Sequence, residues 1–382
     1  MTLRIKAQST TALLIAATLA ATAAQAAPTV VSSSVFATGV AVGGTAPDSI
    51  TYGDGSIWVE YGNGAVSTGG TGSSTIVQYS PSGAIENKYT IAGLVDGLKF
   101  NPSTGMVWAL QNNDGNATLS FINPTTMSVS APLSYAAPPY VYGASSGRGY
   151  DDVAFLNGKV YLSYTNPVNP SDPVLQVLNQ GNSPSGTLST TSILTAQQTN
   201  PLFTSSSQNP PDIDSLKTAP NGSLVLTSEG DGLGSQWATS DGRFTLISNP
   251  GTTLQTVTNV RVTNAAGVNV NAMDDVLFPN ATSGTLYVSD TKTNTVYDVH
   301  LTGLNPDMAI VSLGSFGEVA LVDPTTGVVG MPLLTGHTAP HGLEFVATTP
   351  EPATWSVMLL GIAGLAIASY RRKSGSGSLL AA

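Results

Sequence analysis

The chain has 382 residues, with 13 Lys and Arg against 23 Asp and Glu, and it contains no cysteine. The lack of cysteine excludes disulfides, thiolate metal sites and cysteine nucleophiles. The excess of negative charge argues against a nucleic-acid partner, because an acidic surface repels phosphate groups.

The first 26 residues have the pattern of a signal peptide. Arg4 and Lys6 give a positively charged start, an uncharged stretch runs from Thr10 to Ala23, and Ala24-Gln25-Ala26 is a small-x-small cleavage site. We therefore expect export through the Sec translocon and cleavage between Ala26 and Ala27. The body of the protein is then residues 27–349. Without the charges of the two end segments, it carries 8 Lys and Arg against 22 Asp and Glu.

The body consists of short alternating apolar runs separated by turns rich in Gly, Asn and Pro, which is typical of all-β proteins. Residues 46–91 illustrate the pattern. Strands are expected at Ser49–Tyr52, Ser56–Tyr61, Thr75–Tyr79 and Ala84–Ile91. Four strands joined by three turns predict one up-and-down sheet.

A similar unit recurs along the body. Its first strand begins near an acidic residue or a histidine, and we align the six copies on Asp48, Asp96, Asp152, Asp214, Asp275 and His341. In five copies a second strand follows, at Ile57-Trp-Val, Val107-Trp-Ala-Leu, Val160-Tyr-Leu, Leu224-Val-Leu and Leu286-Tyr-Val. Four-stranded units that repeat about every 59 residues predict a β-propeller.

Six blades are the preferred number, with five or seven as alternatives. The last blade is expected to combine Glu318–Val322, Val328–Leu334, His341–Val346 and an N-terminal strand near Val30–Phe36, so that both chain ends close the ring. Ring closure removes exposed sheet edges. The segment 166–211, rich in Pro, Ser, Asn and Gln, is expected to be a surface insertion.

The Gly-hydrophobic strands and the turns that follow them resemble those of NHL-repeat, SMP-30-like and streptogramin-lyase-like propellers. The resemblance extends over most of the body at the level of blade pattern. It implies a fold and no single activity, because such propellers include lyases, lactonases and plain binding modules.

The C-terminal tail begins with Pro350-Glu351-Pro352, continues with an uncharged stretch at about 353–370 and ends in Arg371-Arg372-Lys373. Eighteen helical residues span about 27 Å, close to the hydrocarbon core of a membrane. A single transmembrane helix is therefore expected, with residues 374–382 as a short cytoplasmic extension.

The tail closely resembles the PEP-CTERM sorting signal of Gram-negative bacteria. This resemblance implies that an exosortase recognises Pro350, Glu351 and Pro352, and that Arg371, Arg372 and Lys373 form the basic stop. It also implies that cleavage near Pro352 releases the body from the inner membrane to the cell surface or to an exopolysaccharide-rich matrix. Residues 374–382 depart from the usual pattern, which leaves a permanent anchor as the alternative.

The repeated acidic residues suggest a cation site. If the first strand of each unit is innermost, then Asp48, Asp96, Asp152, Asp214 and Asp275 ring one mouth of a central channel, where carboxylates would suit Ca²⁺. The alternative is that each carboxylate accepts hydrogen bonds from backbone N–H groups of its own turn. In the pairs Asp151-Asp152 and Asp274-Asp275, strand alternation predicts one inward and one outward side chain.

Two residues are candidates for catalysis. His341 fits the His-Gly element that streptogramin-lyase-like propellers use as acid or base. Glu229 resembles a glutamate of phytase-like and gluconolactonase propellers, although so few Lys and Arg argue against a phosphate substrate.

The sequence favours an exported, non-enzymatic propeller that binds or scaffolds an exopolysaccharide or an envelope protein. The alternative is a Ca²⁺-dependent lyase or lactonase acting at the central channel.

Overall fold

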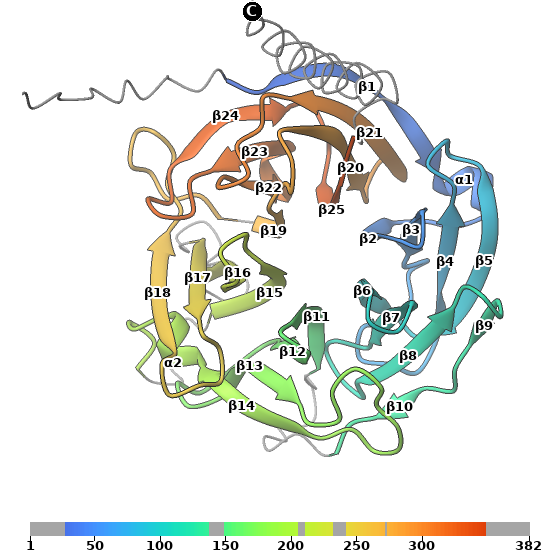
Figure 1. The fold of residues 1–382 in the computed structure, drawn as a ribbon, viewed down its shortest axis with the longest axis horizontal. Coiled ribbons are helices and arrows are strands. Elements are labelled where there is room, and N and C mark those ends of the chain that lie inside the picture. The colour runs from blue at the N-terminus through green and yellow to red at the C-terminus, as the bar shows by residue number, and fades with distance from the viewer. Residues whose placement is uncertain (1–26, 137–148, 205–210, 232–241, 272, 349–382) are drawn as a thin grey trace, which may run out of the picture.

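The computed structural model describes residues 27–136, 149–204, 211–231, 242–271 and 273–348. In these ranges six antiparallel sheets stand around a central axis as the blades of a propeller, which confirms the predicted fold class and blade number (Figure 1). The innermost strands are β2, β6, β11, β15, β19 and β25, and each contacts the innermost strand of the next blade around the ring.

The first four blades follow the chain in order. Blade 1 contains β2 (Pro47–Gly53), β3 (Ser56–Tyr61), β4 (Ser73–Tyr79) and β5 (Ile85–Ala92). Blade 2 contains β6 (Val95–Asn101), β7 (Met106–Gln111), β8 (Thr118–Asn123), β9 (Ser128–Val129) and β10 (Leu133–Ser134). Blade 3 contains β11 (Tyr150–Leu156), β12 (Lys159–Tyr164), β13 (Pro173–Leu178) and β14 (Thr190–Thr195). Blade 4 contains β15 (Pro211–Thr218), β16 (Leu224–Asp231), β17 (Arg243–Ser248) and β18 (Thr256–Arg261).

The chain alternates between blades 5 and 6, so neither blade is built from four consecutive strands. Blade 5 contains β19 (Met273–Leu277), β22 (Ala309–Leu313), β23 (Glu318–Val322) and β24 (Val329–Leu334). Blade 6 contains β25 (Pro340–Ala347), β20 (Ser283–Asp290), β21 (Thr295–Thr302) and β1 (Thr29–Thr38). The short helices α1 (Gly39–Val42), α2 (Ala196–Thr199) and η2 (Gly314–Phe316) lie in connections.

Three expectations need correction. The strand containing Leu286-Tyr-Val pairs with β21 and β25 of blade 6 and not with β19. Glu318–Val322 and Val329–Leu334 belong to blade 5 and not to the closing blade. The segment 166–211 is not a mere surface insertion, because it contains β13 and β14, whose Leu175 and Leu194 are buried between blades 3 and 4. Closure of the ring by β1 and β25, which lie in one sheet, is confirmed.

The hydrophobic core is divided among the interfaces between blades. Trp58 of β3 and Val107 of β7 are fully buried in one cluster between blades 1 and 2. Trp108, the next residue on β7, faces the other way and packs against Val160 of blade 3. Alternate residues of one strand thus serve two interfaces, as a pleated strand buried on both faces requires.

No helix in the described ranges is long and apolar enough to span a membrane. The predicted transmembrane segment at 353–370 lies outside those ranges and stays a prediction.

Candidate functional site

Each innermost strand begins with a β-bulge. In β2 the pairing with β3 jumps from Pro47 to Ile50, and the same jump from the first to the fourth residue occurs in β6, β11 and β19. In β15 a jump of the same length runs from the third residue, Ile213, to the sixth, Leu216. In β25 it occurs between Pro340 and Leu343. A bulge leaves extra residues unpaired and disturbs the strict alternation of side chains. The two residues inside each of these jumps can therefore both face the axis.

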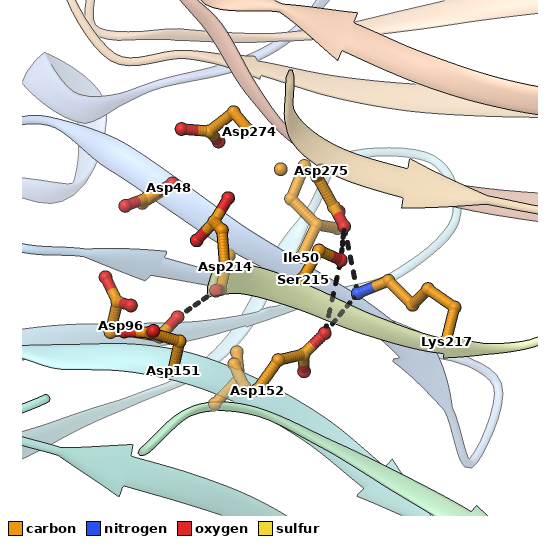
Figure 2. A pocket seen from close by; sticks show the side chains of 13 residues that line it. Asp48, Ile50, Asp96, Asp151, Asp152, Asp214, Ser215, Lys217, Asp274 and Asp275 are labelled. Atoms are coloured by element: carbon orange, nitrogen blue, oxygen red, sulfur yellow. Dashed lines mark hydrogen bonds and ion pairs between the residues drawn. The ribbon is translucent and has the colours of Figure 1, made fainter. Parts of the chain in front are cut away.

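The bulge gives an unambiguous alignment of the six strands. The residues two positions before the first re-paired hydrophobic residue are Asp48, Asp96, Asp151, Asp214, Asp274 and His341. The alignment on Asp152 and Asp275 was therefore off by one residue. Five of these six side chains line one cavity at the start of the innermost strands, which we call the acidic cavity. In Figure 2 the carboxylates of Asp48, Asp96, Asp214 and Asp274 lie around one open space.

Asp152 and Asp275 occupy the third position and have different partners. They also line the acidic cavity, so the expected division into one inward and one outward member of each pair is wrong. The ammonium group of Lys217 lies 2.7 Å from Oδ2 of Asp152 and 3.0 Å from Oδ1 of Asp275 (Figure 2). Oδ2 of Asp152 accepts the backbone N–H of Leu216, and Oδ2 of Asp275 accepts that of Leu343. These two carboxylates therefore join neighbouring blades.

The ion pairs decide the protonation of this group. Burial opposes ionisation of Asp152, but the nearby Lys217 ammonium outweighs it and holds the pKa of Asp152 below its usual value. Burial likewise disfavours the charge on Lys217, but Asp152 and Asp275 raise the pKa of this lysine well above its usual value. Asp152 and Lys217 are therefore charged at neutral pH, and Lys217 bridges Asp152 to Asp275.

In three of the ring carboxylates the pKa is raised, in contrast to that of Asp152. Burial, reinforced by the neighbouring carboxylate of Asp48, raises the pKa of Asp96 well above its usual value. Burial and the charge of Asp274 do the same to the pKa of Asp214. Burial also raises the pKa of Asp274, although His341 partly offsets it. The ring concentrates more negative charge than this environment stabilises, so it favours binding of protons or of a cation.

His341 closes the ring between blades 6 and 1. Its Nδ1 lies 2.9 Å from Oδ1 of Asp274 and 3.5 Å from Oδ1 of Asp48. Burial opposes the charged imidazolium, but the two carboxylates, Asp274 above all, raise the pKa of His341 to about 12. At neutral pH the imidazole is therefore protonated, with a positive charge beside the carboxylates, and it is not a free base.

Two groups of side chains have the spacing that a shared metal ion requires. Ligand atoms of Asp214, Glu229 and Asp274 lie within 4.8 Å of one another, and so do those of Asp48, Asp274 and His341. Two oxygens bound to the same Ca²⁺ at about 2.4 Å are at most about 4.8 Å apart. Oδ2 of Asp214 is buried without a hydrogen-bond partner among the described residues, so this oxygen has the lone pairs that a cation ligand needs. The oxygen-rich first group therefore fits Ca²⁺.

The acidic cavity is small, with a volume of about 70 Å³. This is enough for an ion with a few water molecules, whereas sites for drug-sized ligands have about 300–1,000 Å³.

Sequence reasoning found most of the ring but missed two of its members and one buried carboxyl group near it. Asp151 and Asp274 were passed over because each stands beside a second aspartate, and only the spacing to Val153 and Val276 distinguishes them. Glu60 was not recognised at all. It is fully buried on β3, and burial together with the charge of Asp48 raises its pKa well above the usual value. An acidic residue within Ile57-Trp-Val-Glu-Tyr61, an otherwise apolar strand, was the available signal.

The sorting residues Pro350, Glu351, Pro352, Arg371, Arg372 and Lys373 lie outside the described residues, as does Ala26 of the cleavage site. The described part begins at Ala27, two residues before β1.

Comparisons with known proteins add little to the site. No protein-family model matches the sequence, and no curated protein matches it. Among solved structures, an α-L-arabinanase from Penicillium chrysogenum is similar with a TM-score of 0.47 and 12% identity, over 78% of this chain and 83% of that one. A protein of unknown function from Bacteroides caccae has a TM-score of 0.46 and 11% identity, over 79% and 87% of the two chains. A periplasmic gluconolactonase from Pseudomonas aeruginosa has a TM-score of 0.42 and 11% identity, over 79% and 89%. Likenesses this distant carry no argument about activity.

Proposed function

We propose that this chain is an exported propeller, sorted by its PEP-CTERM tail, that binds Ca²⁺ in the acidic cavity and has a binding or scaffolding role in the cell envelope or its matrix. The observation that supports the cation is the convergence of oxygens from Asp214, Glu229 and Asp274 within 4.8 Å, on strands of two different blades. Ca²⁺ prefers oxygen ligands and tolerates irregular geometry, which a site built from separate blades would provide.

In this proposal Asp214, Glu229 and Asp274 would hold the ion. A bound Ca²⁺ would neutralise charge that otherwise destabilises the ring. Lys217 would hold Asp152 of β11 and Asp275 of β19 in place independently of the ion, since its ammonium group already lies within 3.0 Å of both carboxylates.

Thermal unfolding tests the cation. We expect Ca²⁺ added to protein treated with a chelator to raise the melting temperature by several degrees, since a ligand at a hundred times its Kd stabilises by about 2.7 kcal/mol. Asp214→Asn is expected to have two opposite effects. It raises the melting temperature without Ca²⁺, because it removes an unfavourable buried charge, and it abolishes the shift with Ca²⁺. The matched control is Asp307→Asn at an exposed position. A wild-type protein whose melting temperature ignores Ca²⁺ rules the cation out.

Export, sorting and the binding role need tests of their own. We expect mass spectrometry of the mature protein from its native host to show Ala27 as the first residue and a C-terminus near Pro352. An intact 374–382 segment would instead mean a permanent anchor. Panning the body against glycans and envelope proteins tests the binding role, which fails if the body turns over a lactone or an ester and retains no such partner.

A second candidate function is a Ca²⁺-dependent lyase or lactonase in the same cavity. The observation in its favour is that protonated His341 contacts two ring carboxylates, where it could donate a proton to a leaving oxygen. The volume of about 70 Å³ argues against it, because it is well below the roughly 300 Å³ at which small-molecule sites begin. Turnover of a lactone panel that His341→Gln abolishes would establish this function over the first.

A further inference from the structure

A second, larger cavity lies toward the other end of the innermost strands. Its volume is about 290 Å³. Its lining includes the fifth and sixth residues of β6, β11 and β25, whereas the ring residues of these three strands are second residues. Four residues of extended strand separate the two levels by about 13 Å. We call it the phenylalanine cavity, because Phe100, Phe155, Phe278 and Phe345 line it from β6, β11, the residue after β19, and β25.

Lys217 separates the two cavities. It lines both of them, and its ammonium group is directed at Asp152 and Asp275 on the acidic side (Figure 2). The part of Lys217 that faces the phenylalanine cavity is therefore its aliphatic chain. The charge of this lysine is balanced by the two carboxylates and is not available to a ligand on the other side.

Lys99 supplies the positive charge of the phenylalanine cavity. It is the fifth residue of β6 and only partly exposed, and it forms no ion pair within 4 Å among the described residues. Glu344, the fifth residue of β25, is the one carboxyl group in the lining, and it accepts a hydrogen bond from the backbone N–H of Tyr52. Lys99 is one of only eight Lys and Arg in the body, and it is the one cation of this lining besides Lys217, whose charge is already paired.

Apolar side chains line the same cavity as the charge of Lys99. Four phenyl rings provide apolar surface of the kind on which the face of a sugar or of an aromatic ring packs. Thr218 and Asn280 add polar groups to the lining. A volume near the lower limit of about 300 Å³ for small-molecule sites suits a ligand of a single ring.

We propose that the phenylalanine cavity is a binding site for a small, single-ring carboxylate, whose carboxylate group pairs with Lys99 and whose ring packs against the phenylalanines. The site is independent of the proposed Ca²⁺ site, since Lys217 stands between them. Both a sugar acid and an aromatic acid combine a carboxylate with a single ring. They differ in whether a sugar ring or an aromatic ring would pack against the phenylalanines.

Ligand-observed NMR and calorimetry with two probe pairs test the proposal. The pairs are galacturonate with its methyl ester and benzoate with its methyl ester, all in the presence of a chelator. We expect at least one acid to bind about tenfold more tightly than its own ester, because the ester lacks the charge that Lys99 would pair with. Preference for galacturonate identifies a sugar acid as the ligand class, and preference for benzoate identifies an aromatic acid.

Variants locate the binding. Lys99→Gln is expected to remove the tenfold preference, whereas Lys292→Gln, at an exposed turn, keeps it. Asp214→Asn is also expected to keep it, which separates this site from the acidic cavity and its Ca²⁺. If Lys99→Gln fails to fold, Glu344→Gln provides a test in the other direction, because removing the opposing carboxyl should tighten binding about threefold. The proposal is overturned if neither acid binds, or if the preference for the acid survives in folded Lys99→Gln.

Discussion

Nδ1 of His341 lies 2.9 Å from Oδ1 of Asp274, so that the innermost strands of blades 6 and 5 are joined by a charged hydrogen bond. His341→Gln removes the positive charge and leaves Asp274 and Asp48 to repel each other. We expect it to lower the free energy of unfolding by about 1.5–3 kcal/mol, as for other hydrogen bonds to charged groups. Urea unfolding with a chelator measures this loss. His300→Gln, whose imidazole is half exposed and 3.9 Å from Asp298, is the control and should cost much less.

Lys217 should be among the residues least tolerant of substitution. Lys217→Met keeps most of the aliphatic chain but leaves Asp152 and Asp275 as buried charges without a counter-ion, which typically costs about 3–5 kcal/mol. The triple variant Lys217→Met, Asp152→Asn and Asp275→Asn removes the charges together and should recover a substantial part of that loss. Urea unfolding of both variants decides the matter. Equal stability of the single and triple variants would show that lost packing, and not uncompensated charge, is the cause.

Acid should destabilise the protein partly through Asp290, a fully buried residue at the end of β20. Burial by itself would raise its pKa, but hydrogen bonds from the backbone N–H groups of Thr338, Thr293 and Ala339 hold the pKa below its usual value. Burial keeps nearby His337 neutral by lowering its pKa.

Because the pKa of Asp290 is lower in the folded than in the unfolded state, its stabilisation is complete above the unfolded value of about 4 and is lost as the pH falls through the folded value. We expect the free energy of unfolding to decrease as the pH falls below about 4, and Asp290→Asn to be less stable at pH 6 but less sensitive to acid. Urea unfolding across this range measures both effects. Parallel pH profiles for the two proteins would contradict this assignment.

Strand β1 should be essential to a monomeric propeller. It is the outermost strand of blade 6, and its Ser34 donates a hydrogen bond to Asp298 of β21. Removing residues 27–38 exposes the edge of β21, and exposed edges promote aggregation. We expect size-exclusion chromatography of the truncated body to show oligomers or aggregates. A protein that starts at Thr29, and so keeps all of β1, should remain monomeric.

The sequence was sufficient to predict the class of fold and the ring of acidic residues, because the same short pattern recurs at the start of every innermost strand. It was insufficient to decide between Asp151 and Asp152, or between Asp274 and Asp275. The bulge that makes the difference depends on the pairing with the next strand, and neighbouring aspartates satisfy the pattern in either register.

The exchange of strands between blades 5 and 6 was beyond sequence reasoning for another reason. Strands β20 and β22 are both short, apolar runs, and either could pair beside β19 with similar local interactions. Only packing between blades selects β22. In that arrangement Leu286 and Val288 of β20 are buried against Ile310 and Val319 of blade 5, in one cluster shared by the two blades.

The position of β1 also determines the order in which the molecule can be completed. Ser34 and Asp298 are 264 residues apart, so β1 can pair with β21 only when nearly the whole body is available. Blade 5 is delayed as well, since β19 must await β22 while the chain builds part of blade 6. Contacts between distant residues slow folding and prolong the exposure of unpaired strands. The completed ring is therefore a late product of folding, and a sheet edge stays exposed until β1 and β25 complete blade 6.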